Sequence, residues 1–190
     1  MKIKNIFIIC GILMLLGGLG LLAYNMWDNY RAKNESSDIL DIIKIERDKL
    51  VHDNKIDSTN NESIKIDDYN YIGIIRIPKI KIELPVIDSC DDKKLKKGPC
   101  LYHGSQEESN MIIAAHDYYS HFGKLNKLRI GDSIIFEDIN GNVFEYEVSD
   151  TEILTKNDVD EMQDGDWDLT LFTCTISGSN RTTIRAKKQI

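Results

Sequence analysis

The stretch "LTLFTC", from Leu169 to Cys174, is an apolar run that ends on a cysteine close to the C-terminus. Arg181 stands seven residues further on and opens another β-rich run, "RTTIRAK". A hairpin through the intervening loop, "TISGSN", would bring Arg181 back towards Cys174. An unpaired cysteine is usually a small core residue. The alternative is a nucleophile that a rigid strand presents at its end, and the rest of the sequence bears on that choice.

A cysteine nucleophile needs a histidine or another cation nearby in space, because the thiolate is the reactive form and the pKa of a free thiol is about 8.5. Three histidines lie in polar segments: His52, His103 and His121. The fourth, His116, ends the apolar run "NMIIAAH". If these strand ends converge, Cys174, His116 and Arg181 form a site for acyl transfer, with Arg181 next to the developing oxyanion and no metal.

The bulk composition fits one globular domain with an added segment. The chain has 190 residues, of which 42% are apolar and 29% are charged. Its formal net charge of -7, with no basic stripe interleaved with aromatic residues, argues against a nucleic-acid partner. The four cysteines are too few for a disulfide framework and lack the spacing of a zinc site.

The N-terminal run from Ile6 to Tyr24 carries no charge over about 19 residues, enough to span a bilayer as a helix. No small-x-small cleavage site follows Ala23, and Tyr24, Trp27 and Tyr30 are typical interfacial aromatics. We therefore expect an uncleaved signal-anchor at 6–24 that binds the chain to the membrane. A small difference in positive charge between the two sides of this run favours a cytoplasmic tail at 1–5 and an extracellular domain.

Residues 25–68 are expected to form a stalk helix and a linker. "SSDILDIIKIERDKL" places apolar residues at helical spacing, and Ser36 or Ser37 would cap its N-terminus. The helix is expected to pack on the domain or to lie near the membrane. "HDNKIDSTNNESIKIDD", residues 52–68, is polar and typical of a linker.

From Tyr69 to the C-terminus the pattern predicts an all-β domain, 69–190. "KIKIEL", residues 79–84, alternates strictly and predicts a half-buried strand. "INGN", residues 139–142, predicts a tight hairpin. Short helices are expected in "DDKKLKKG", "FGKLNKL" and "NDVDEM". Many short strands in about 120 residues predict a closed or nearly closed β-barrel.

These residues resemble the sortases, the membrane-anchored cysteine transpeptidases of Gram-positive bacteria. The resemblance rests on "TLFTC", on Arg181 at the start of the next strand and on an upstream strand that ends in His116. Further matching stretches are "IGIIRIPKIKIELPV", "NMIIAAHDYYSHFGKLNKLRIGDSIIFED" and "GNVFEYEVSD", so that the similarity covers residues 72–187. It implies an eight-stranded sortase-type β-barrel with short helices.

The resemblance also implies a reaction and its partners. Cys174 would attack an LPxTG-like sorting signal of a surface protein and form a thioester. His116 would protonate the leaving amine, and Arg181 would orient the substrate and stabilise the oxyanion. An amine of a peptidoglycan precursor or a pilin lysine would then resolve the thioester. Thr173 is expected to contribute only weakly to substrate contacts, and no cofactor is implied.

Some features depart from the family pattern. Ala115 replaces the glycine that commonly precedes the histidine. Asp117 would raise the pKa of His116 if it lies close, although a solvated loop carboxylate is the favoured interpretation. The sequence carries neither the long helical insertion of class B members nor the lid motif of class C members, so the subclass stays open.

Two further features are interpreted as structural. The acidic run Asp158–Asp168 resembles a calcium-binding loop of some class A members, but its spacing fits a soluble helix and turn better. Cys90 and Cys100 would be able to bond in an oxidising compartment. The resemblance gives them no role, and a helix in "DDKKLKKG" is expected to hold them apart, so they are expected to be unpaired.

Two alternatives to a transpeptidase stay open. The same site would serve a thiol hydrolase in which water resolves the acyl-enzyme. A non-catalytic, membrane-anchored β-module would instead keep Cys174 in its core.

Overall fold

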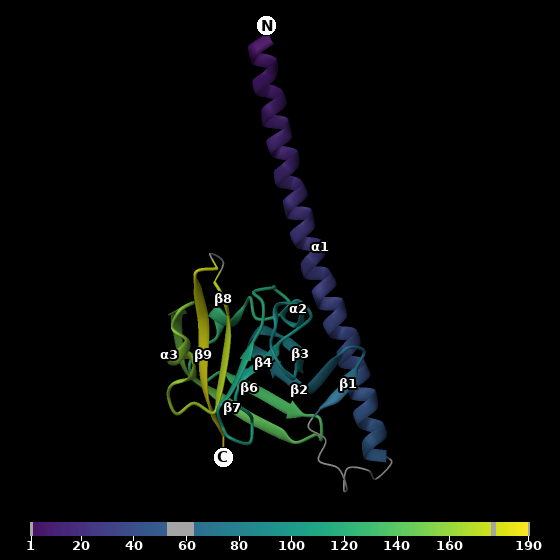
Figure 1. Cartoon of the computed structure of the whole chain (residues 1–190), viewed down its shortest axis with the longest axis vertical. Coiled ribbons are helices and arrows are strands. Elements are labelled where there is room, and N and C mark those ends of the chain that lie inside the picture. Colours follow the sequence, from purple (N-terminus) through teal and green to yellow (C-terminus); the bar gives the residue numbers. More distant parts are fainter. Residues whose placement is uncertain (1, 53–62, 176–177, 190) are drawn as a thin grey trace.

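The computed structural model describes residues 2–52, 63–175 and 178–189. A long helix lies beside a β-barrel (Figure 1). The helix, α1, runs without a break from Lys2 to His52. Its C-terminal half lies along the barrel, and its N-terminal half projects beyond it (Figure 1). The predicted anchor and stalk are therefore parts of one helix.

Nine strands form one sheet: β1 (Ile64–Ile66), β2 (Tyr69–Ile77), β3 (Ile82–Ile87), β4 (Cys100–His103), β5 (Met111–Ala114), β6 (Ser133–Asp138), β7 (Val143–Thr155), β8 (Leu169–Cys174) and β9 (Asn180–Lys188). Their order is β1-β2-β3-β4-β5-β8-β9-β7-β6, and an additional β2–β6 pairing closes the ring. The ring contains eight strands, as predicted, and β1 is attached outside it through β2. β1 lies in the segment expected to be a linker, of which residues 53–62 lie outside the described part of the chain.

In the described part of the chain, four short helices interrupt the strands: α2 (Asp92–Leu95), α3 (Val159–Gln163) and the 3-10 helices η2 (Pro78–Ile80) and η3 (Leu125–Lys127). The predicted strand 79–84 was only partly correct, because η2 covers its first two residues and Lys81 follows as the cap. Pro78 has a fixed φ that suits this turn, and Lys81 adopts a left-handed φ of 55°. The strand therefore begins at Ile82.

The predicted hairpin at 139–142 is confirmed as the β6–β7 turn. Gly141 adopts a φ of 86° there, a conformation that costs glycine little. The Gly141 amide donates to the Asp138 carbonyl at 3.1 Å, and the Asp138 carboxylate accepts from the Asn142 amide at 2.8 Å. The turn fixes the register of two strands that enclose the core.

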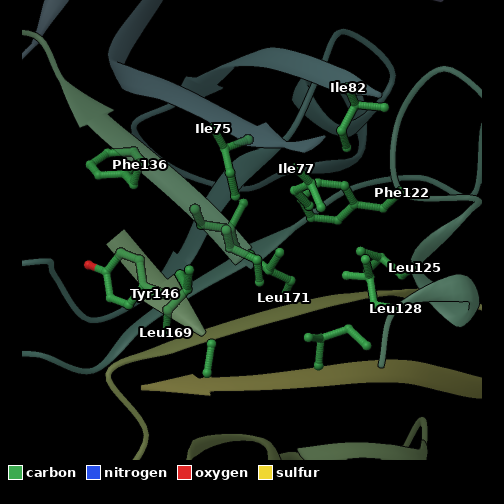
Figure 2. Close-up of a cluster of buried hydrophobic side chains, with 14 of the residues drawn as sticks. Ile75, Ile77, Ile82, Phe122, Leu125, Leu128, Phe136, Tyr146, Leu169 and Leu171 are labelled. Carbon is green, nitrogen blue, oxygen red and sulfur yellow. The ribbon is translucent and has the colours of Figure 1, made fainter. Parts of the chain in front are cut away.

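Alternate residues of the strands fill the barrel (Figure 2). On the wall made by β5, β8 and β9, the inward side chains are Met111, Ile113, Ala115, Leu169, Leu171, Ile184 and Ala186. Side chains that alternate with these belong to the outer face of the wall, because successive residues of a strand point to opposite faces. This alternation places Phe172 and Cys174 on the outer face.

The helix α1 packs on the barrel through one face. Its buried residues are Ala32, Ser36, Leu40 and Ile43, which recur at helical spacing. Leu40 and Ile43 share a core cluster with Tyr71, Ile74 and Ile87 of the barrel. Ser36 lies in the helix interior rather than at the predicted cap, because the helix does not begin there.

Charged side chains also join α1 to the barrel. Arg47 and Arg76 both pair with the carboxylate of Glu137, which is 7% exposed. Lys44 pairs with Glu83 at 3.1 Å. Two arginines compensate the buried charge of Glu137, since a buried carboxylate is costly unless it is paired.

The N-terminal half of α1 is apolar and exposed. Large side chains such as Phe7, Met14 and Leu21 are at least 68% exposed. Within the described residues, α1 is the one helix long and apolar enough to cross a membrane. It is therefore a candidate membrane anchor, in agreement with the span predicted from the sequence.

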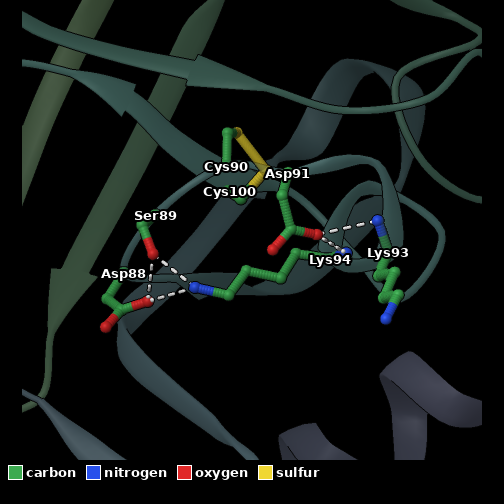
Figure 3. Close-up of a disulfide and its surroundings, with 7 residues drawn as sticks. All are labelled: Asp88, Ser89, Cys90, Asp91, Lys93, Lys94 and Cys100. Atoms are coloured by element: carbon green, nitrogen blue, oxygen red, sulfur yellow. Dashed lines mark hydrogen bonds and ion pairs between the residues drawn. A yellow bond between two sulfur atoms is a disulfide. The ribbon is translucent and has the colours of Figure 1, made fainter.

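The expectation that Cys90 and Cys100 stay unpaired was wrong, because they form a disulfide (Figure 3). The helix between them, α2, has only four residues, and the chain after it turns back towards Cys90. The two Cα atoms lie 5.2 Å apart, within the range that a disulfide requires. Asp91 caps α2 by accepting from the amides of Lys93 and Lys94.

We expect Cys90→Ala/Cys100→Ala to lower the free energy of unfolding by about 2–3 kcal/mol, the loop-entropy value for a short loop. Chemical denaturation of the full-length chain in detergent would measure it. Peptide mapping of the wild-type protein, alkylated without reductant, should find both cysteines in one cross-linked peptide. Free, alkylated Cys90 would contradict the disulfide.

We expect Ile43→Ala to destabilise the docked helix by about 2–5 kcal/mol, because it leaves a cavity in a packed cluster. Ile45→Ala is the matched control, since Ile45 is on the same helix and 55% exposed. Thermal unfolding of both variants in the full-length chain would compare them. Equal losses would show that this face of α1 is not packed on the barrel.

Candidate active site

Cys174 and Arg181 face each other across the β8–β9 hairpin. They are direct partners in the antiparallel register, as are Phe172 and Thr183. Side chains of directly opposed residues project to the same face, with Cβ atoms about 4.5–5.5 Å apart. The hairpin predicted from "TISGSN" therefore brings the thiol and the guanidinium together on the outer face. Of that loop, residues 176 and 177 lie outside the described part of the chain.

The histidine reaches the same place from the other side of β8. β5 runs parallel to β8, with Ala114 paired to Phe172. The Ala115 amide donates to the Phe172 carbonyl at 3.2 Å, which continues the pairing past the end of β5. Continuing this register brings His116 level with Cys174. The end of β8 is thus flanked by the end of β5 and the start of β9, which is the condition that the sequence left open.

Cys174 is a free, partly exposed thiol rather than a core residue. Its neighbour Thr173 is the residue that turns inwards. Thr173 is 4% exposed, and its hydroxyl donates to the Ala115 carbonyl at 2.8 Å. The threonine therefore ties the nucleophile strand to the residue that precedes His116.

Two arginines on the outer face of β9 have different surroundings. Arg185 is 3% exposed and pairs with Glu152 at 2.7 Å, the Met162 carbonyl at 2.8 Å and the Thr170 hydroxyl at 3.0 Å. Arg181 is partly exposed, and its Nη1 lies 3.4 Å from the Asn180 carbonyl. Within the described residues, no carboxylate forms an ion pair with Arg181. The Arg181 side chain therefore retains donors for a ligand.

A small apolar cluster lies near the thiol on the outer side of the wall. Ile112, Leu154, Met162 and the partly buried Phe172 form a separate hydrophobic cluster. The ring of Tyr102, 41% exposed, meets Phe172 edge to face at 5.2 Å. Met162 belongs to α3, so this helix covers the wall beside the β8–β9 hairpin.

The environment of His116 lowers its pKa. Partial burial is the main cause, because it disfavours the charged imidazole, and Lys96 acts in the same direction. The carboxylates of Asp117, Asp92 and Asp28 oppose this shift. Asp117 does raise the pKa, as one interpretation of the sequence held, but burial outweighs it.

Two aromatic side chains near His116 were not anticipated from the sequence, His121 and Tyr118. His121 was expected in a polar loop, yet it is fully buried, and burial lowers its pKa to about 4. Tyr118 lies between the two imidazoles, with ring centroids 5.3 Å from His116 and 5.4 Å from His121. His103 is the last residue of β4, and its side chain is exposed. The side chain of His52 lies outside the described part of the structure.

The acidic run Asp158–Asp168 has partners within the protein. Asp158 accepts from the amide and hydroxyl of Thr155 at 2.6 and 2.7 Å. Asp166 pairs with Lys187 at 2.9 Å. These contacts form the helix and turn expected at this position.

Comparisons with known proteins agree with this arrangement. A sequence profile described as the sortase domain matches residues 75–189. The chain is 28% identical to Sortase A of Bacillus anthracis over 188 residues, covering 92% of this chain and 89% of that protein. It is 31% identical to Sortase D of Bacillus subtilis over 119 residues, covering 60% of each chain.

Solved structures share the fold. A sortase D5 transpeptidase of Clostridium perfringens superposes with a TM-score of 0.61 at 23% identity, covering 83% of this chain and 98% of that one. Sortase C of Streptococcus pneumoniae gives a TM-score of 0.57 at 27% identity, with 66% and 69% covered. Sortase A of Corynebacterium diphtheriae gives 0.57 at 24% identity, and the match spans 62% of that chain. With the profile match over more than half of its length, the chain belongs to the sortase family.

Proposed function

We propose that this chain is a cysteine transpeptidase that cleaves an LPxTG-like sorting signal and transfers the protein to an amine. The observation that carries the proposal is the convergence on one outer face of Cys174, of Arg181 directly opposite it, and of the segment ending in His116. Members of the sortase family are cysteine transpeptidases, which supports the reaction class.

In the first half-reaction, the Cys174 sulfur attacks the carbonyl carbon of a threonine-like residue. The bond from sulfur to carbon forms while the carbonyl oxygen becomes an oxyanion, which Arg181 stabilises by donating hydrogen bonds. The bond from carbon to nitrogen then breaks. His116 delivers a proton to the leaving amine, and a thioester on Cys174 results.

The lowered pKa of His116 adds a condition to this step. Burial disfavours the charged imidazole and so favours the neutral ring. The proton that His116 delivers must therefore first be taken up, and the thiol of Cys174 is the natural source because it must lose one to become nucleophilic.

In the second half-reaction, an acceptor amine attacks the thioester, and the thiol is regenerated as an amide forms. The proposed acceptors are an amine of a peptidoglycan precursor and a pilin lysine. Water competes with the amine at this point, which defines the alternative of a thiol hydrolase with the same residues. The free thiol outside the core argues against the non-catalytic β-module.

We further propose that residues 1–5 are cytoplasmic, that 6–24 span the membrane and that the barrel domain, 69–190, is extracellular. The exposed apolar half of α1 supports the span. The Cys90–Cys100 disulfide supports the location, since disulfides persist in oxidising compartments. Residues 25–52 of α1 would then carry the barrel beside the membrane.

We expect Cys174→Ala to abolish transfer and Arg181→Ala to lower kcat/KM by about 100-fold or more, the range for removing an oxyanion donor. The full-length protein would be mixed with LPxTG-like peptides, with and without an amine, and followed by intact mass. A wild-type adduct on Cys174 that converts to a peptide–amine product supports the transpeptidase.

Arg129→Ala is the matched control, because Arg129 lies in an exposed turn where it bonds to the carbonyls of Asn126 and Leu128. A wild-type adduct released only as the acid would favour the hydrolase. Full transfer by the Cys174→Ala variant would refute the proposed nucleophile.

We propose a positioning role for Thr173, while a weak direct contact with substrate stays a prediction. Thr173→Val should cost about 1–3 kcal/mol of stability, because it leaves the buried Ala115 carbonyl without its hydroxyl donor. Thr173→Ser keeps the donor and should restore most of kcat. Denaturation and kinetics on the two variants would check this; equal activity of both would refute the role of the hydrogen bond.

A further inference from the structure

The loop after β5 is bonded to α1 at three of its residues. The Tyr118 hydroxyl donates to the Asp28 carboxylate. The Tyr119 amide donates to the Asn29 side chain at 2.9 Å. His121 is held at Ser36, where its Nε2 lies 3.1 Å from the serine oxygen.

Small residues let the loop approach the helix this closely. Ala32 is 0% exposed and Ser36 is 3% exposed, and both lie on the face of α1 that meets the barrel. The Ser36 hydroxyl donates its one proton to the Lys97 carbonyl at 3.2 Å. It must therefore accept in its contact with His121, so Nε2 of His121 is the protonated ring nitrogen. The Ala32 carbonyl is a second acceptor for His121.

The same loop presents His116. The Phe122 amide donates to the His116 carbonyl at 3.3 Å, and the Phe122 side chain is buried in the barrel core. The amides of His121 and Gly123 both donate to the Tyr118 carbonyl, at 2.9 and 3.0 Å. The loop is thus a compact turn held by the core on one side and by α1 on the other. A shift of α1 would move the imidazole of His116.

We propose that the segment of α1 from Asp28 to Ser36 is a positioning element of the active site, which fixes the loop that presents His116 to Cys174. The proposal rests on the proposed function for the role of His116. The segment begins four residues after Tyr24, the end of the apolar run. The segment that follows the candidate membrane anchor therefore also holds the loop that carries His116.

Charged groups from three elements face His116: Asp117 on its own loop, Lys96 and Asp92 from the segment around α2, and Asp28 from α1. Arg31 pairs with Asp28 at 2.8 Å and with Glu35 at 3.0 Å, and thereby holds the Asp28 carboxylate in place. Undocking of α1 removes the Asp28 carboxylate and releases the loop that carries His116, so the pKa of His116 should change.

Ser36→Leu tests the proposal in the full-length chain in detergent micelles. The added side chain has no room between α1, His121 and Lys97, so it should force the helix away from the loop. Ser37→Leu is the matched control, because Ser37 is the exposed next residue of the same helix. We expect Ser36→Leu to lower kcat by about tenfold with little change in KM, since it misplaces a catalytic group. The control should leave kcat unchanged.

A second readout does not depend on activity. NMR titration of histidines labelled at Cε1 reports the pKa of each ring. In Ser36→Leu, the pKa of His121 should rise from about 4 towards 6.5, which shows undocking, and that of His116 should change with it. Asp28→Asn removes the charge that pairs with Arg31 and raises the pKa of His116, so it should lower the pKa of His116. The equivalent change in the exposed Asp41 should not.

The outcomes separate the two proposals. Undocking with an unchanged kcat and an unchanged pKa of His116 would overturn the positioning role. A wild-type protein without any transfer would overturn the proposed function instead. In that case the titrations alone decide whether α1 positions the loop.

Discussion

The register of β8 between its two neighbours is the constraint on which the site depends. β8 is parallel to β5 on one side and antiparallel to β9 on the other. Leu169 and Leu171 must face the core, and this fixes the face on which Cys174 emerges. A slip of one residue would bury the thiol and expose the leucines, so the hydrophobic core holds the nucleophile in place. The hydrogen bond from Thr173 to the Ala115 carbonyl applies the same constraint across β5 and β8.

The docked helix imposes a second constraint. The N-terminal half of α1 is apolar and exposed, whereas one face of its C-terminal half completes the protein interior. Ile43 fills a cluster with Ile87, and Ser36 covers a fully buried imidazole. That imidazole, His121, stays neutral because its Nδ1 has no partner among the described residues and a buried charge would be costly. A domain cut off after α1 would lose these contacts, so the barrel alone is not an equivalent of the whole chain.

Burial also distinguishes residues of the same type near the site. Arg181 and Arg185 lie on the same face of β9, four residues apart along the strand. Arg185 is enclosed by Glu152 and the carbonyls of α3, and it holds this helix on the wall. Arg181 sits at the open end of the hairpin opposite Cys174. Figure 1 shows that this end of β8 and β9 is the one nearer to the projecting half of α1. The chemistry is thus concentrated at the end of the barrel closer to the candidate anchor.

The sequence by itself determined the elements whose signals are local. Strand alternation and the Asn-Gly turn predicted the barrel, the uncharged run predicted the span, and the motif around Cys174 with His116 and Arg181 predicted the family and the candidate site. Only the tertiary structure decided what depends on segments distant in the chain. The Cys90–Cys100 disulfide depends on where a one-turn helix ends. The burial of His121 depends on a helix 85 residues away that packs on its loop. A periodic pattern shows that a face is apolar, but it does not show which surface covers that face, because packing is settled by shapes that meet only after folding.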